Sequence, residues 1–124
     1  DEALAFWFAP GHAVFVAEAD GDLLGTYFLR PNKKGPGSHV ANAGYVTAAA
    51  AEGRGVGRAM LAHSLDEARA RGYLAMQFNA VVATNTRAVA TWQKAGFEIV
   101  GRGPGVFRPP DLGLVDTLIM HRML

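Results

Sequence analysis

A short glycine-rich segment carries the clearest chemical signal in this sequence. Residues 52–58 read Glu-Gly-Arg-Gly-Val-Gly-Arg, and a pattern typical of an amphipathic helix follows directly. Glycine lets a ligand approach the backbone closely, and the first-turn N–H groups of a helix have no intrahelical acceptor. Together with the positive end of the helix dipole, such N–H groups bind phosphate-type anions. The segment therefore predicts an anion site, to which Arg54 and Arg58 add positive charge.

Two widespread phosphate-binding motifs do not match this segment. The pattern GxxxxGK[ST] has no counterpart in the chain, and the pattern GxGxxG meets Arg58 or Met60 where its third glycine belongs. P-loop hydrolysis and Rossmann dinucleotide binding are therefore not supported. The remaining alternative is a glycine-rich turn that only reverses the chain, and the two arginines favour the anion site over it.

Asparagine and histidine residues form the second group of candidates. Asn42 and Asn79 lie inside stretches that read as β-strands, where asparagine is depleted. Each side chain could bond its own backbone at a strand end or bulge, or it could face a substrate as a neutral donor and acceptor. We expect the second role for both. We expect packed or solvent-exposed side chains at His39, His63 and His121.

The elements that position these residues follow from hydrophobic periodicity and turn signals. Strands are predicted over residues 13–19, 23–30, 39–47, 73–79, 97–100 and 114–123. Helices are predicted over residues 54–72 and 84–96, because apolar side chains recur about once per helical turn. Residues 31–38 and 101–113 read as loops rich in glycine and proline. Three strands followed by alternating helices and strands predict an α/β fold with a mixed sheet.

Composition limits the class of protein. The 124 residues are 50% hydrophobic and 19% charged, which predicts one soluble globular domain over residues 1–124. A net charge of +1 gives no overall attraction to nucleic acid or to an anionic membrane, so neither is an expected partner. The absence of cysteine excludes disulfides, thiolate metal sites and a cysteine nucleophile. The apolar stretch 3–17 is too broken for a membrane helix or signal segment, and the cytoplasm is the default location.

Two segments of the chain resemble the GCN5-related N-acetyltransferase family. The segment AEGRGVGRAML at residues 51–61 is similar to the family's pyrophosphate motif, which reads Gln or Arg, two residues, Gly, any residue, Gly or Ala. The segment NTRAVATWQKAGF at residues 85–97 is similar to the family's helix that begins with Asn and ends in Gly-Phe. Further segments at 39–45, 78–85 and 115–116 resemble the branch that contains the azetidine carboxylate (proline-analogue) acetyltransferases of yeast.

The resemblance implies a specific fold. Members of the family have a mixed β-sheet that is splayed at its centre, with flanking helices and with acetyl-CoA between the two parting strands. The resemblance begins at the first predicted hairpin, and residues 1–10 are too short for the strand and helices that the family places before it. We therefore expect that N-terminal part, and with it much of one wall of the acceptor site, to be missing from the chain.

The resemblance also implies roles for individual residues. Val46, Thr47 and Ala48 correspond to the family's backbone contacts with the pantetheine arm and the acetyl carbonyl. Asn85 corresponds to the family's asparagine near the pantetheine. The implied pyrophosphate turn consists of Arg54, Gly55, Val56, Gly57, Arg58 and Ala59. Acetyl-CoA is the implied co-substrate, and no metal is implied.

The chain departs from the family pattern at two positions. Glu52 stands where the motif begins with Gln or Arg, and its carboxylate would weaken phosphate binding unless it points away or pairs with Arg54 or Arg58. Trp92 stands where many members have a tyrosine that is thought to protonate the departing thiolate. An indole N–H is not a usable acid, so we expect Trp92 to be a core aromatic and the thiolate to take its proton from water.

The expected function is an acetyl-CoA-dependent N-acetyltransferase. The neutral amine of a small amino-acid-like acceptor would attack the thioester directly, with Asn42 and Asn79 holding the acceptor. Positioning and backbone donors to the oxyanion would supply most of the catalysis, and no residue is assigned as general base. Two alternatives stay open: a non-catalytic acyl-CoA-binding module, and a protein or peptide N-acetyltransferase. A homodimer is an open option.

Overall fold

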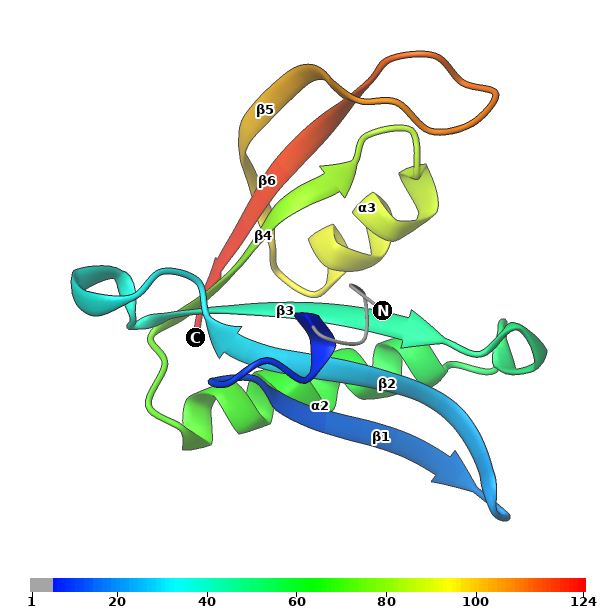
Figure 1. Ribbon diagram of the computed structural model, residues 1–124, viewed down its shortest axis with the longest axis vertical. Coiled ribbons are helices and arrows are strands. Elements are labelled where there is room, and N and C mark those ends of the chain that lie inside the picture. Colours follow the sequence, from blue (N-terminus) through cyan, green and yellow to red (C-terminus); the bar gives the residue numbers. More distant parts are fainter. Residues whose placement is uncertain (1–5) are drawn as a thin grey trace.

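A computed structural model describes residues 6–124 as a six-stranded sheet with helices against it (Figure 1). The strands are β1 (Ala13–Ala19), β2 (Asp22–Pro31), β3 (Val40–Thr47), β4 (Ala75–Val82), β5 (Glu98–Phe107) and β6 (Val115–Met123). The α-helices are α2 (Val56–Ala70) and α3 (Thr86–Lys94), and short 3-10 turns cover Gly35–Gly37 and Ala49–Ala51. Among these described residues, no helix has both the length and the apolar character needed to cross a membrane.

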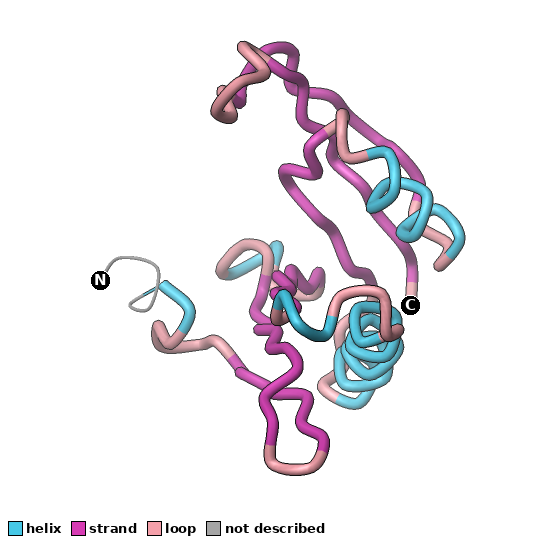
Figure 2. The backbone as a smooth tube through the Cα atoms, turned by 90° about the vertical axis from the view of Figure 1, so that its right-hand side faces the viewer, coloured by secondary structure: helices cyan, strands magenta, loops and turns pink. Residues whose placement is uncertain are grey.

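The sheet divides between its third and fourth strands. Its order is β1-β2-β3-β4-β6-β5, and every neighbouring pair except β3–β4 is antiparallel. The parallel pair β3–β4 is in register at only two places, Val40 with Ala75 and Ala41 with Met76. Beyond these pairs the strands separate, and Figures 1 and 2 show the β4–β6–β5 half turning away from the β1–β2–β3 half. The prediction of a mixed, centrally splayed sheet is confirmed.

Helix α2 holds the first half of the sheet together. Its N-cap, Gly55, has a φ of +79°, a left-handed conformation that glycine adopts without steric cost. Its apolar stripe packs against β2 and β3, and the buried members of this core include Val56, Met60, Leu61, Leu65, Ala68, Tyr27, Leu29, Ala41 and Ala43. The chain runs from the end of β3 through the 3-10 turn Ala49–Ala51 into the N-terminus of α2, so the glycine-rich turn follows closely after the last residues of β3.

Helix α3 covers the second half of the sheet through aromatic packing. Asn85 is its N-cap, and its Oδ1 accepts a hydrogen bond from the Ala88 N–H at 3.2 Å, as its sequence position predicts. Trp92 packs against Phe78 with ring centroids 4.8 Å apart, and Phe78 stacks on Phe97 at 4.5 Å. The predicted placement of Trp92 on the packed face of the helix is therefore observed, although its side chain is only partly buried.

The prediction of a loop over residues 101–113 is wrong for its first seven residues, because β5 continues to Phe107. A Cβ on Gly101 would lie 3.1 Å from Ile119, and one on Gly103 would lie 3.0 Å from the Thr117 hydroxyl. These glycines thus allow close packing of β5 on β6 and do not mark a turn. The carboxylate of Asp116 further joins the two strands by accepting hydrogen bonds from the Gly105 N–H at 2.8 Å and from Arg102 at 2.7 Å.

Candidate functional site

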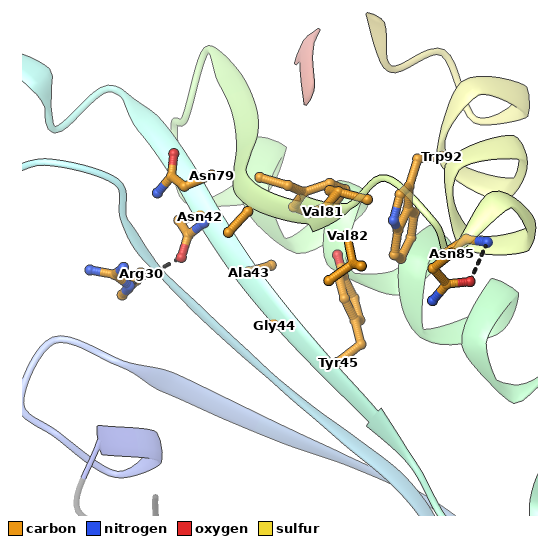
Figure 3. Close-up of a pocket in the computed structure, with 13 residues that line it drawn as sticks. Arg30, Asn42, Ala43, Gly44, Tyr45, Asn79, Val81, Val82, Asn85 and Trp92 are labelled. Carbon is orange, nitrogen blue, oxygen red and sulfur yellow. Dashed lines mark hydrogen bonds between the residues drawn. The ribbon is translucent and has the colours of Figure 1, made fainter. Parts of the chain in front are cut away.

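A cleft of about 420 Å³ opens where β3 and β4 separate (Figure 3). This volume is in the range of small-molecule sites, roughly 300–1,000 Å³. Strands β2, β3 and β4 and helix α3 all contribute to it. Its lining consists of Arg30, Asn42, Ala43, Gly44, Tyr45, Phe78, Asn79, Ala80, Val81, Val82, Asn85, Ala88 and Trp92.

The backbone of β3 provides hydrogen-bonding groups on the cleft side. In an antiparallel pair, alternate residues bond to the partner strand, and the others direct their N–H and C=O groups away from it. Ala48 donates to the Leu24 carbonyl at 2.8 Å, so this residue and, by alternation, Val46 face β2. Tyr45 and Thr47 face the opposite way, towards β4, at a point where β4 no longer pairs with β3.

This alternation distinguishes among the predicted contacts on β3. Of Val46, Thr47 and Ala48, only Thr47 directs its backbone N–H towards the open gap. Tyr45 shares this direction and lines the cleft, but sequence reasoning did not select it. The period of two along a strand could have identified Tyr45 together with Thr47, if the partner strand on each edge had been known.

The predicted anion turn has the backbone shape that close ligand approach requires. Gly53 and Gly55 both have a φ of +79°, and a Cβ on Gly57 would meet no atom within 4 Å. The N–H of Arg54 donates to Ala51 at 3.2 Å. The N–H of Ala59, at the other end of the predicted set, donates to Gly55 at 3.0 Å. The groups between these ends belong to the first turn of α2, where helix geometry provides no intrahelical acceptor: Val56, Gly57 and Arg58.

The charged side chains of this turn are exposed to solvent. Arg54 and Arg58 are both exposed, and an Arg58 nitrogen lies 3.8 Å from where a Cβ on Gly55 would be. Glu52 is also exposed, and within residues 6–124 no ion pair joins it to either arginine. We expect the Glu52 carboxylate either to pair with one of these arginines or to point away from the phosphate site. The structure shows no such ion pair among the described residues.

Asn42 and Asn79, predicted from their unusual strand positions, come together at the cleft. Asn42 is buried with 7% of its surface exposed, and its Nδ2 donates to the Gln77 carbonyl at 2.9 Å. Gln77 directly follows Met76, the last residue of β4 that pairs with β3. Asn42 therefore satisfies a carbonyl that the separation of the two strands leaves without a backbone partner on β3. Asn79 is exposed, and its Nδ2 donates to Asn32 at 2.7 Å.

The Asn85 amide borders the cleft from the start of α3 (Figure 3). Its oxygen is engaged in the helix cap, so its NH₂ group is the part that can donate to a ligand. The side chain therefore combines a capping role with a position on the cleft wall.

Tyr45 and Trp92 form the aromatic wall of the cleft, with ring centroids 5.5 Å apart. The Tyr45 hydroxyl and the Ser64 hydroxyl share a hydrogen bond of 2.6 Å. Burial raises the pKa of Tyr45 to about 12, and the Ser64 hydrogen bond opposes this rise only in part. Tyr45 therefore stays protonated at neutral pH and cannot act as a base there.

The histidines singled out in the sequence lie away from this cleft. His39 is exposed, with Nδ1 3.2 Å from the Pro36 carbonyl oxygen. His63 hydrogen-bonds to the Tyr27 hydroxyl at 2.5 Å, on the face of the sheet that α2 covers. His121 lies on β6. Among the described residues that line the cleft there is no histidine and no carboxylate.

Comparison with known proteins shows which family this chain resembles in sequence and in structure. Residues 1–97 match the family model described as the acetyltransferase (GNAT) family. A structure of a GCN5-related N-acetyltransferase from Kribbella flavida is 46% identical with a TM-score of 0.92, covering 99% of this chain and 76% of that one. A structure of a ribosomal-protein-alanine N-acetyltransferase from Brucella melitensis is 28% identical with a TM-score of 0.83. The match covers 99% of this chain and 75% of that chain.

The match to a curated relative from fission yeast covers a smaller share of the relative than of this chain. The N-acetyltransferase aca1 of Schizosaccharomyces pombe is 30% identical over 93 residues, which are 75% of this chain and 44% of that protein. The chain thus spans less than half the length of this relative. The family model covers most of the chain, and the two solved structures share its fold with TM-scores of 0.92 and 0.83. The chain therefore belongs to the acetyltransferase (GNAT) family.

Proposed function

We propose that this chain transfers an acetyl group from acetyl-CoA to the amine of a small amino-acid-like acceptor. The observation that carries the proposal is that two features follow one another along the chain: the edge of β3 that β4 leaves unpaired, and the glycine-rich turn at the start of α2. The free edge of β3 offers backbone donors at Tyr45 and Thr47. The turn that follows it offers the N–H groups of α2 to a pyrophosphate.

The proposed chemistry is direct attack on the thioester. The neutral amine adds to the acetyl carbonyl, and the negative charge develops on the carbonyl oxygen. Collapse breaks the C–S bond and expels the thiolate, the nitrogen gives one proton to water, and the thiolate takes a proton from water. A backbone N–H of Tyr45 or Thr47 would stabilise that oxygen without reorganising during the reaction. The chain's main contribution is to hold donor and acceptor at one place in the cleft.

Two measurements test the function itself. Titration calorimetry with acetyl-CoA measures donor binding, and a thiol-release assay measures turnover with proline analogues, other free amino acids, a polyamine and a short peptide. We expect binding together with acetylation of the amino acids. Binding without turnover on any amine would instead support a non-catalytic acyl-CoA-binding module.

A protein acceptor is the second candidate. It is favoured by the 28% identity to a solved structure named a ribosomal-protein-alanine N-acetyltransferase. The panel therefore includes a peptide with N-terminal alanine. Faster acetylation of that peptide than of free alanine would replace the small-molecule proposal with this one.

Asn79→Ala should lower kcat/KM for the acceptor without affecting stability. Asn79 is exposed, so the fold does not depend on it, but its amide borders the cleft. Loss of a hydrogen bond to a charged substrate group corresponds to about 1.5–3 kcal/mol, or roughly tenfold to a hundredfold in kcat/KM. The matched control is Asn32→Ala, which breaks the same 2.7 Å bond from a residue outside the cleft lining. Equal losses of kcat/KM in Asn79→Ala and Asn32→Ala would show that the hydrogen bond between the two amides supports activity, and that Asn79 does not bind the acceptor.

Asn42→Ala should lower kcat/KM by a similar factor and should also destabilise the fold. The substitution leaves the Gln77 carbonyl without its 2.9 Å partner beside a buried position. An unsatisfied buried acceptor costs about 1–3 kcal/mol in the free energy of unfolding. Denaturant unfolding and acetyl-CoA affinity are measured beside the kinetics. Full acceptor activity in both Asn42→Ala and Asn79→Ala would refute the role of the two amides.

Trp92→Phe should retain most of the activity. Phenylalanine keeps an aromatic ring against Phe78 and Tyr45 and most of the apolar volume, while the indole N–H is lost. If the thiolate needs no side-chain acid, turnover changes by less than about tenfold, because loss of acid catalysis would cost roughly a hundredfold or more. Single-turnover rates of the folded variant provide the measurement. A drop of a hundredfold would mean that the indole participates in the chemistry.

A further inference from the structure

Among the described residues that line the cleft, Arg30 is the one that carries a charge. It lies near the end of β2, opposite Asn42 of β3, and its side chain is partly buried. The other described lining residues are apolar or uncharged polar groups. Figure 3 shows its guanidinium at the end of the cleft where Asn42 and Asn79 also lie.

Two neutral groups fix the Arg30 side chain. Its Nε donates to the Asn42 Oδ1 at 3.2 Å, and its Cζ lies 5.5 Å from the centroid of the Phe6 ring. Asn42 is itself held by its bond to the Gln77 carbonyl at the point where the strands separate. The guanidinium is thus oriented by a buried amide that cannot move without breaking a second hydrogen bond.

Neither partner neutralises the charge. Within residues 6–124, no carboxylate lies within 4.0 Å of Arg30, while three other arginines of the chain have such partners. The bond to Asn42 uses only Nε, so the terminal nitrogens retain donors for a further group. A partly buried cation in a cleft with apolar walls gains most from an anion, and the planar guanidinium fork matches a carboxylate with two parallel hydrogen bonds.

We propose that Arg30 binds the carboxylate of the acceptor and that Asn42 is its positioning residue. This inference rests on the proposed acetyltransferase function and names the substrate class: a small amine that carries a carboxylate. Asn42 and Tyr45 are three residues apart on β3, about 10 Å at the rise of a strand. That separation leaves room for a molecule of amino-acid size between the Arg30–Asn42 pair and the backbone donors.

The test compares acceptors that differ only in the carboxylate. The probes are L-alanine with L-alaninamide, and L-proline with L-prolinamide. In Arg30→Gln the amide can still donate to Asn42, but the positive charge is lost. We expect kcat/KM to fall by about tenfold to a hundredfold for the amino acids and by less than about threefold for the carboxamides. Comparing each variant with the parent on the same acceptor cancels the different amine pKa values.

Two further variants separate charge from fold. Arg30→Lys keeps the charge without the fork and should recover part of the lost activity on the amino acids. Arg108→Gln removes a charge from an exposed residue outside the cleft and should leave kcat/KM unchanged. Acetyl-CoA affinity should be the same in all three variants and the parent.

The outcomes distinguish this inference from the function on which it rests. If the parent acetylates amines but Arg30→Gln loses equal activity on acids and amides, or none on either, the carboxylate role is overturned while the acetyltransferase proposal stands. If the parent binds acetyl-CoA but acetylates none of the four probes or the wider amine panel, the proposed function fails and this inference fails with it.

Discussion

The value of kcat/KM should rise about tenfold per pH unit until the acceptor amine is half deprotonated. Only the neutral amine has the lone pair that attacks the thioester, and its fraction grows tenfold per pH unit below the amine pKa. Among the described lining residues, the cleft offers no carboxylate or histidine that would change protonation in this range. Burial raises the pKa of Tyr45 to about 12, so its hydroxyl stays protonated throughout the experiment.

The measurement is a pH profile of kcat/KM for two acceptors of different basicity. With L-alaninamide and L-alanine, the inflection should follow the amine pKa of each molecule, since the acceptor and not the chain supplies the titrating group. The Tyr45→Phe variant is the control, because it removes the tyrosine hydroxyl and keeps the ring against Trp92. An inflection common to both acceptors, or a fall of kcat/KM between pH 7 and pH 9, would reveal a catalytic group in the protein.

The local elements of the fold could be predicted because each is marked in nearby residues. Asn85 caps α3, and Gly55 takes the left-handed conformation at the start of α2. The length of β5 could not be predicted in this way. Gly101 and Gly103 resemble turn residues in sequence, but they are small because β6 lies close to them. That reason depends on a contact between strands, which no local pattern records.

The residues of the candidate site also differ in whether local sequence could identify them. The anion turn could be found because its glycines and its helix are continuous in sequence. Tyr45 and Arg30 were missed, because their relevance depends on which edge of β3 faces the gap and on which strand lies opposite Asn42. Asn42 was found for its rarity in strands, yet its bonds to Gln77 and Arg30 follow only from the separation of β3 and β4.

Gly57→Glu should weaken acetyl-CoA binding by at least tenfold while the protein remains folded. A Cβ at this position meets no atom within 4 Å, so the fold tolerates a side chain there. The new carboxylate would stand in the first turn of α2, beside the N–H groups proposed to bind the pyrophosphate. Like charges about 4 Å apart repel by roughly 4 kcal/mol at an effective dielectric constant near 20, well above the 1.4 kcal/mol of a tenfold change.

Two control variants isolate the cause of that loss. Gly57→Ala adds a Cβ without charge and should bind acetyl-CoA almost as well as the parent, since the space is open. Ala70→Glu places the same carboxylate on the exposed last residue of α2, about 20 Å along the helix and beyond the roughly 10 Å screening length at 0.1 M salt. Calorimetry at low and high salt should show a deficit that shrinks with salt only in Gly57→Glu. If folded Gly57→Glu binds acetyl-CoA with unchanged affinity, the pyrophosphate does not bind at this turn, because a carboxylate there could not leave two phosphate charges unaffected.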